Sequence, residues 1–131
     1  MFVGSFGDLI FEVSNYKVLT FKDFKREGGA KYATHEVIGQ PPKVEYLHRE
    51  LEKLSLEIDL VSSLGVNPED EVQKITDMCN DGEANYLVIN GQVYGDCQWI
   101  IESYSEDVKY FGGDGEILMS KISLKLIEYS Q

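Results

Sequence analysis

The sequence predicts a single, mainly β domain with one α-helix, and three observations lead to that fold class. Apolar and polar residues alternate along most of the 131-residue chain, which is typical of strands with one buried face. The apolar spacing becomes helical in one segment only. Apolar residues make up 43% of the chain, so a folded core is expected, and this length fits one domain.

Strands and turns are predicted for the first half of the chain. The predicted strands span residues 9–13, 17–21, 32–38, 44–47 and 54–60. The turn signal Ser14-Asn15 joins the first two as a hairpin. Pro41-Pro42 separates the third from the fourth, because proline cannot donate to a ladder. Leu54, Leu56, Ile58 and Leu60 make the last of these strands the clearest amphipathic strand in the sequence.

The segment 21–44 is expected to be a flexible arm or an extended hairpin. It is polar and basic between Lys22 and Lys31, and Gly28-Gly29 adds a flexible turn. The charge run fits a solvated face, or an arm that becomes ordered against the acidic surface of a neighbour. Because few core residues are expected there, deleting Lys22 to Lys31 is predicted to leave the fold intact.

One helix is predicted over residues 68–80. Asn67 is a good N-cap, and Pro68 suits the first helical position. Acidic residues follow in the first turn, where the helix dipole favours them. Gly82 suits a left-handed cap beyond the end. The apolar side chains at helical spacing should cover one face of a sheet.

Strands return after the helix. A short strand over 86–89 leads into the hairpin turn Asn90-Gly91. Gly95-Asp96 is expected to break the next strand or to form a bulge. Beyond it, Trp99, Ile101, Ser103 and Ser105 are predicted to share one face. A turn over 112–115 and a long strand over 117–129 complete about eight strands, packed as two sheets or as one strongly curled sheet, with the helix against an edge or end.

The charge balance excludes some partners. The chain has 23 acidic and 12 basic residues, a net charge of −11 and a pI near 4.5. It therefore lacks the cations that bind duplex nucleic acid or anionic membranes. Cys79 and Cys97 are expected to be free thiols, and residues 1–13 have no features of a signal peptide.

No catalytic constellation is evident, and we expect neither an enzyme nor a cofactor or metal site. His35 and His48 are the only histidines, and neither cysteine has a basic neighbour in sequence. The acidic pairs fit the solvated face of a strand better than a hydrolase site. The interpretations left open are a self-assembling structural protein, a monomeric β-barrel or sandwich that binds a small ligand or peptide, and a hydrolase.

Aromatic residues favour an interaction role. Eight tyrosines and six phenylalanines are present, many outside the strongest strand patterns. Exposed aromatic and arginine side chains are enriched at protein interfaces. The candidate subunit-interaction residues are Phe21, Phe24, Lys25, Arg26, Tyr32, His35, Val37 and Tyr46.

An ordered set of short motifs resembles the GpU family of phage tail proteins. The motifs are Gly4-Ser5-Phe6-Gly7-Asp8 with Ile10 to Val13, His35-Glu36-Val37-Ile38-Gly39 with Pro41-Pro42, Gly65-Val66-Asn67-Pro68, Gly91 and Gly95 with Trp99-Ile100-Ile101, and Asp114-Gly115 with Ile122 to Tyr129. The chain departs from the family over 47–51, where relatives often carry glycines. The resemblance spans nearly the whole sequence, and no single motif carries chemistry.

The resemblance implies a role in tail assembly. It implies a curled β-sandwich or barrel of the phage tail-tube type with a flanking helix over about 68–80, and a hexameric ring near the baseplate hub, as tube initiator or adaptor. The partners are then other copies of this chain and other tube, hub or baseplate proteins. The arm would reach the neighbouring subunits. DNA would be only passing cargo in an acidic lumen, because like charge repels it. Assembly would take place in the bacterial cytoplasm, and the protein would end in the virion tail of a phage or of a related phage-like particle.

Overall fold

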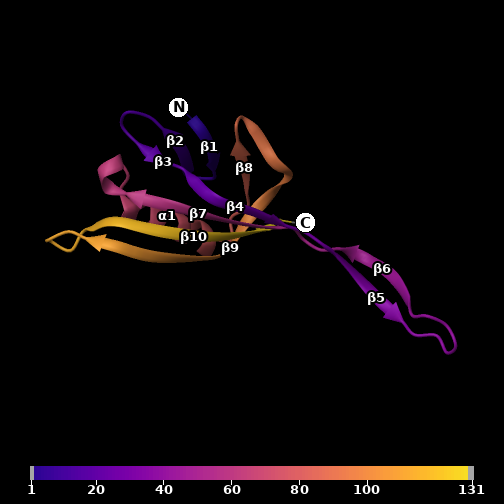
Figure 1. Ribbon diagram of the computed structural model, residues 1–131. Helices are drawn as coiled ribbons and strands as arrows, with labels where there is room; N and C mark the ends of the chain where they lie inside the picture. The colour runs from indigo at the N-terminus through magenta and orange to yellow at the C-terminus, as the bar shows by residue number, and fades with distance from the viewer. Residues whose placement is uncertain (1, 130–131) are drawn as a thin grey trace.

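The computed structural model describes residues 2–129 and confirms a mainly β chain with one α-helix (Figure 1). These residues form ten strands, more than the eight or so expected, and a short 3-10 helix over Ser62–Leu64. The elements are β1 (Phe2–Phe6), β2 (Leu9–Val13), β3 (Val18–Leu19), β4 (Phe21–Glu27), β5 (Ala30–His35), β6 (Lys43–Arg49), β7 (Lys53–Val61), α1 (Pro68–Asn80), β8 (Asn85–Ile89), β9 (Gln92–Phe111) and β10 (Ile117–Glu128).

Eight strands form one curled sheet in the order β3-β2-β1-β8-β9-β10-β7-β4. Its two edge strands, β3 and β4, are separated along the chain by Thr20 alone. The sheet therefore curls until its two edges meet at one continuous segment, which pairs first with β2 and then with β7. Within residues 2–129 no ladder joins β3 to β4, so the sheet is curled but is not a closed barrel.

The core lies inside the curl and comes from the predicted alternation. Leu54, Leu56, Ile58 and Leu60 are all buried on β7, and β10 places Ile122, Leu124 and Leu126 beside them in antiparallel register. Burying each such side chain stabilises the fold by about 1.5–3 kcal/mol. The amphipathic strand predicted over 54–60 is confirmed.

The face predicted for β9 is correct only as far as Ile101. Trp99 and Ile101 are buried, but Ser103 and Ser105 are exposed. The register with β10 shifts between Ile101 and Ser103, so Glu102 is an extra residue in β9. A one-residue bulge turns the following side chains to the other face. Tyr104 therefore packs against the core instead.

Helix α1 spans the predicted residues. The Asn67 side chain accepts hydrogen bonds from the backbone N–H groups of Glu69 (3.1 Å) and Asp70 (3.4 Å), which confirms the predicted cap. Ile75 and Met78 are buried against the inside of the sheet. Gly82 has the expected left-handed φ of 62°. The helix thus covers the core with one face, as predicted.

The predicted hairpin turn between β8 and β9 is also present. Asn90 and Gly91 have φ values of 53° and 76°, as a type I′ turn requires. Gly95 and Asp96 have φ values of 77° and 53° and fall where the β8–β9 register shifts. This is the expected bulge.

Strands β5 and β6 form a separate two-stranded hairpin that projects far from the curled sheet (Figure 1). The segment expected to be an arm, 21–44, begins differently, because its first part is β4, a strand of the main sheet. The hairpin continues instead to Arg49. Deleting Lys22 to Lys31 would therefore remove most of an edge strand, including Phe24, which packs on the core, so the predicted tolerance of that deletion is wrong.

A candidate interaction surface on the projecting hairpin

The projecting hairpin has one apolar face that none of residues 2–129 covers. We call residues 28–51 the arm. Tyr32 lies opposite Tyr46 and Thr34 opposite Val44, so these four side chains share one face, the apolar arm face. The two tyrosine rings meet edge to face, with centroids 5.6 Å apart. Tyr32 and Tyr46 are each 56% exposed and Val44 is 66% exposed.

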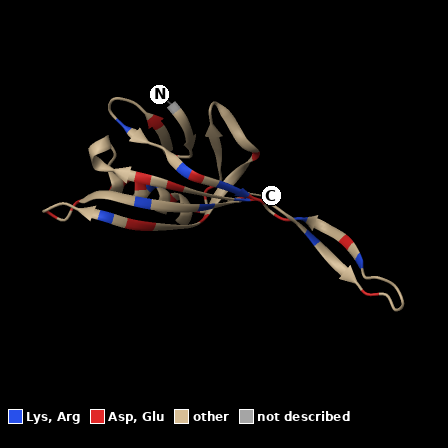
Figure 2. Cartoon of the chain, in the orientation of Figure 1, with Lys and Arg blue, Asp and Glu red and all other residues tan. Residues whose placement is uncertain are grey.

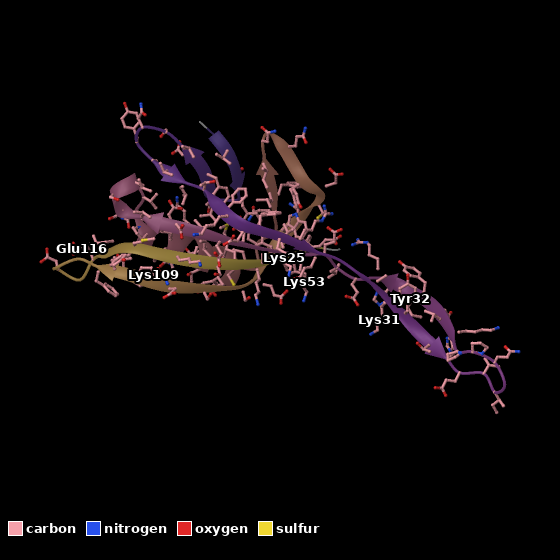
Figure 3. All side chains as sticks on the ribbon, viewed as in Figure 1. Lys25, Lys31, Tyr32, Lys53, Lys109 and Glu116 are labelled. Atoms are coloured by element: carbon pink, nitrogen blue, oxygen red, sulfur yellow. The ribbon has the colours of Figure 1, made fainter. Side chains whose placement is uncertain are left out.

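Such a hairpin is unusual for a chain in isolation. Two strands without a covering layer are marginally stable in water. Exposed aromatic and branched side chains gathered on one face indicate a surface that another protein covers. Figure 3 shows Tyr32 standing on the arm, well away from the body.

The opposite face of the arm is polar. His35 Nε2 lies 2.6 Å from the Glu45 carboxylate across the two strands. Lys31 and Lys43 form no ion pair with any residue in 2–129. At the tip, the backbone N–H of Gln40 donates to the Val37 carbonyl (3.1 Å), and Ile38 is fully exposed. The arm is thus amphipathic, with Lys31 and Lys43 on the face opposite the apolar arm face.

Aromatic rings fix the root of the arm within the subunit. Phe21 contacts Phe11 (centroids 5.2 Å apart) and Phe24 contacts Tyr94 (5.0 Å apart). The Arg26 guanidinium lies 5.3 Å from the centre of the Tyr94 ring. Arg26 also donates a hydrogen bond to Glu52 (2.8 Å). Lys25, by contrast, is exposed, and its one ion pair within residues 2–129 is with Glu27 at 3.0 Å.

A second clamp joins the arm to the end of the sheet. Arg49, the last residue of β6, donates two hydrogen bonds, of 2.7 and 2.8 Å, to the two carboxylate oxygens of Glu128 on β10. The backbone N–H of Glu52 donates a third, of 3.1 Å. These donors, Arg49 first, lower the pKa of Glu128 from 4.5 to about 2. The clamp holds the arm in one direction relative to the sheet.

The predicted interaction residues therefore fall into two groups. Tyr32, His35, Val37 and Tyr46 lie together on the arm, whereas Phe21, Phe24, Lys25 and Arg26 lie on β4 at its root. Two features of the arm were not predicted from the sequence: the exposed Val44 and the pairing of Arg49 with Glu128. The exposure of Val44 could have been inferred from its i, i+2 spacing to Tyr46. The clamp between Arg49 and Glu128, 79 residues apart, leaves no local signal in the sequence.

Charge is divided unevenly between the arm and the body. The arm contains three basic residues and three acidic ones, so the rest of the chain carries the entire net charge of −11. On the body, residues of both signs alternate across neighbouring strands (Figure 2). Lys22 pairs with Asp59 (2.9 Å), Lys121 with Glu57 (3.0 Å) and Lys109 with Asp107 (2.6 Å), on the outer face of β4, β7, β10 and β9.

The chemistry of the described residues gives little support to a ligand or catalytic site. A hollow of about 220 Å³ beside Lys53, Glu102 and Lys125 is lined mainly by charged side chains, whereas small-molecule pockets are mostly apolar. Burial raises the pKa of the Cys97 thiol, which makes it a poor nucleophile. Within residues 2–129 no three His, Cys, Asp or Glu side chains gather closely enough to hold a metal ion. No helix in this range is long and apolar enough to cross a membrane.

Comparison with known proteins identifies a family whose model matches this chain. The family described as Phage P2 GpU matches residues 7–131, nearly the entire chain. The match includes the arm, helix α1 and every strand from β2 onward. A search of curated proteins finds no match.

Proposed function

This chain belongs to the Phage P2 GpU family and is a phage tail structural protein, and from that premise we propose that it forms a ring in the tail tube. The ring is hexameric and lies near the baseplate hub, as tube initiator or adaptor. Its partners are sister copies and the neighbouring tube, hub or baseplate proteins. The chain assembles in the bacterial cytoplasm and has no enzymatic activity.

The uncovered apolar arm face is the observation that supports this proposal best. A monomeric protein gains nothing from extending two tyrosines and a valine into water on a two-stranded hairpin. In a ring, each arm can bury this face on another copy, and cyclic closure limits growth. Two contacts at the root, Arg26–Glu52 and Arg49–Glu128, orient the arm before assembly, which lowers the entropy lost on binding.

The charge distribution fits a tube through which DNA passes. Because the arm is neutral, the negative charge of a ring lies on its bodies. A lumen of net negative charge repels nucleic acid and lets it slide without binding. We therefore propose DNA as passing cargo and not as a ligand.

Measurement of assembly with and without the arm tests this function. The full chain is expected to form particles of six times its 14.9 kDa mass, either alone or in tails reconstituted with partner proteins. A variant in which two glycines replace residues 30–49 should fold, because the arm contributes no residue to the core, but should fail to enter rings. Native mass spectrometry and circular dichroism provide the two readouts.

A point variant provides the matched control. Tyr16 is 89% exposed in the turn between β2 and β3, outside the arm, and Tyr16→Ala should assemble normally. A full-length chain that stays monomeric alone and enters tails as one copy would contradict the ring. Normal assembly by the arm-deleted variant would contradict the role of the arm.

A further inference from the structure

The body carries a second uncovered apolar surface, on the outer face of β2, β1, β8 and β9. In the register of these strands, Ile10 lies opposite Ser5, Ser5 opposite Val88, and Val88 opposite Val93. One row of side chains therefore crosses four strands on a single face. Ile10 is 48% and Val93 41% exposed, and Tyr86, 52% exposed, stands in a neighbouring row of this face. We call this surface the apolar body face.

The outer face of the curled sheet has two parts, and they differ in the free energy needed to cover them with another protein. The row across β2, β1, β8 and β9 contains no ionisable side chain. The outer face of β4, β7, β10 and β9 carries the lysine–carboxylate pairs described above, such as Lys22–Asp59 and Lys121–Glu57. Covering charged groups removes their hydration, which costs several kcal/mol per ion, whereas covering an apolar row is favourable. Only the first face is suited to close packing against an apolar partner.

The apolar arm face matches this surface in shape and chemistry. Both are faces of antiparallel β-structure made of branched and aromatic side chains, and such faces pack directly on each other. A subunit cannot cover its own apolar body face with its own arm, because the arm projects away from the sheet (Figure 1). The occupant must come from another molecule.

Charge indicates that the other molecule is a second copy of this chain. The body carries the whole net charge of −11, so two bodies repel each other, while the neutral arm approaches without that penalty. The apolar arm face itself, made of Tyr32, Thr34, Val44 and Tyr46, brings no Asp, Glu, Lys or Arg side chain into the contact.

We infer that the apolar arm face of each subunit packs on the apolar body face of the next subunit. This contact is heterologous, joining unlike surfaces, and therefore closes a ring when the rotation between subunits is suitable. The inference rests on the ring proposed above and adds the acceptor surface to it. Tyr46 and Val93 should then lie across one interface.

Cross-linking between singly substituted chains tests the contact. Facing β-layers lie about 10 Å apart, so a short bis-maleimide bridges them better than a disulfide. Tyr46→Cys and Val93→Cys proteins, mixed after separate purification, should give a covalent dimer, and the double variant should give a ladder that ends in a closed ring. Tyr110→Cys, 64% exposed near the far end of β9, replaces Val93→Cys in the control mixture and should give no dimer. The unsubstituted chain reveals any background from Cys79 and Cys97, which are both half-buried.

Each outcome decides between specific alternatives. Rings that form but do not link position 46 to position 93, or that link 46 to 110 instead, overturn the acceptor surface and leave the ring intact. Linkage of Tyr46→Cys to itself indicates symmetric pairing of arms and also overturns it. A chain that never forms oligomers, even in assembled tails, overturns the ring as well.

A charge placed on the acceptor provides an independent readout. Val93→Glu should lower the association constant at least tenfold, because a carboxylate is then covered without a partner. Tyr110→Glu should leave association unchanged. Both positions are exposed, so circular dichroism should show the same fold for both variants. Equal association of the two variants contradicts the inference.

Discussion

Replacing Glu128 by Gln should loosen the arm and destabilise the chain by a predictable amount. In the native chain, Arg49 and the backbone N–H of Glu52 together donate three hydrogen bonds to this carboxylate. Its pKa falls from 4.5 to about 2 as a result. Glutamine keeps the size of the side chain but removes the charge, so the substitution isolates the electrostatic part of the clamp.

The magnitude follows from the two pKa values. Their difference of about 2.5 corresponds to about 3 kcal/mol of preferential stabilisation of the charged form. The Arg49 side chain is 57% exposed, and screening by water reduces the contribution to about 1–2 kcal/mol. Glu128→Gln should therefore lower the free energy of unfolding by about 1–2 kcal/mol at pH 7.

The pH dependence has a defined sign. Because the folded pKa is depressed, the clamp contributes fully above pH 4.5, and the contribution is lost as pH falls towards 2. Urea unfolding at pH 7 and pH 2.5 should show a large difference between wild type and Glu128→Gln at the first pH and little at the second. Spin labels at positions 38 and 110 should show a broader distribution of distances in Glu128→Gln than in wild type, because the arm loses its fixed direction.

A matched control separates this clamp from ordinary surface pairs. Glu27 pairs with Lys25 at 3.0 Å on the exposed side of β4, so Glu27→Gln should not change stability measurably. Unfolding of Glu128→Gln at the same urea concentration as wild type at pH 7, or equal stability of the two glutamine variants, would show that the clamp does not stabilise the chain.

Three further substitutions test the fold by urea unfolding. Ile122→Ala removes a fully buried side chain from β10 and should cost about 2–5 kcal/mol; a loss below 1 kcal/mol would mean that the site is not core. Asn67→Ala removes the cap of α1 and should cost about 1 kcal/mol, and unchanged stability would show that the cap is not used. Gly65→Ala should cost more than 1 kcal/mol, because φ is 82° and the new Cβ would collide with the Tyr16 carbonyl oxygen; a stability equal to wild type would contradict this backbone conformation.

The sequence was sufficient to predict much of the local structure. The caps of α1, the Asn90-Gly91 turn and the apolar alternation of β7 each depend on residues close together in the chain, and each is confirmed. The face of β9 beyond Ile101 was predicted wrongly, because the bulge at Glu102 depends on the register with β10 and not on the local pattern.

The surface was harder to predict than the core. The position of the arm was anticipated only partly, since β4 joins the main sheet by pairing with β7, more than twenty residues later in the chain. The uncharged row from Ile10 to Val93 is assembled from four strands and becomes visible only when their register is known. For the same reason the pairing of Arg49 with Glu128 could not be inferred from either segment alone.

The most direct test of the assembly is a cryo-electron microscopy reconstruction of the hub end of the tail in a phage that carries this protein. We expect a closed ring of copies in which every β5–β6 arm leaves its own body and lies on β2, β1, β8 and β9 of the adjacent copy. A single copy per tail, or arms that lie in solvent or on a different protein, would contradict it.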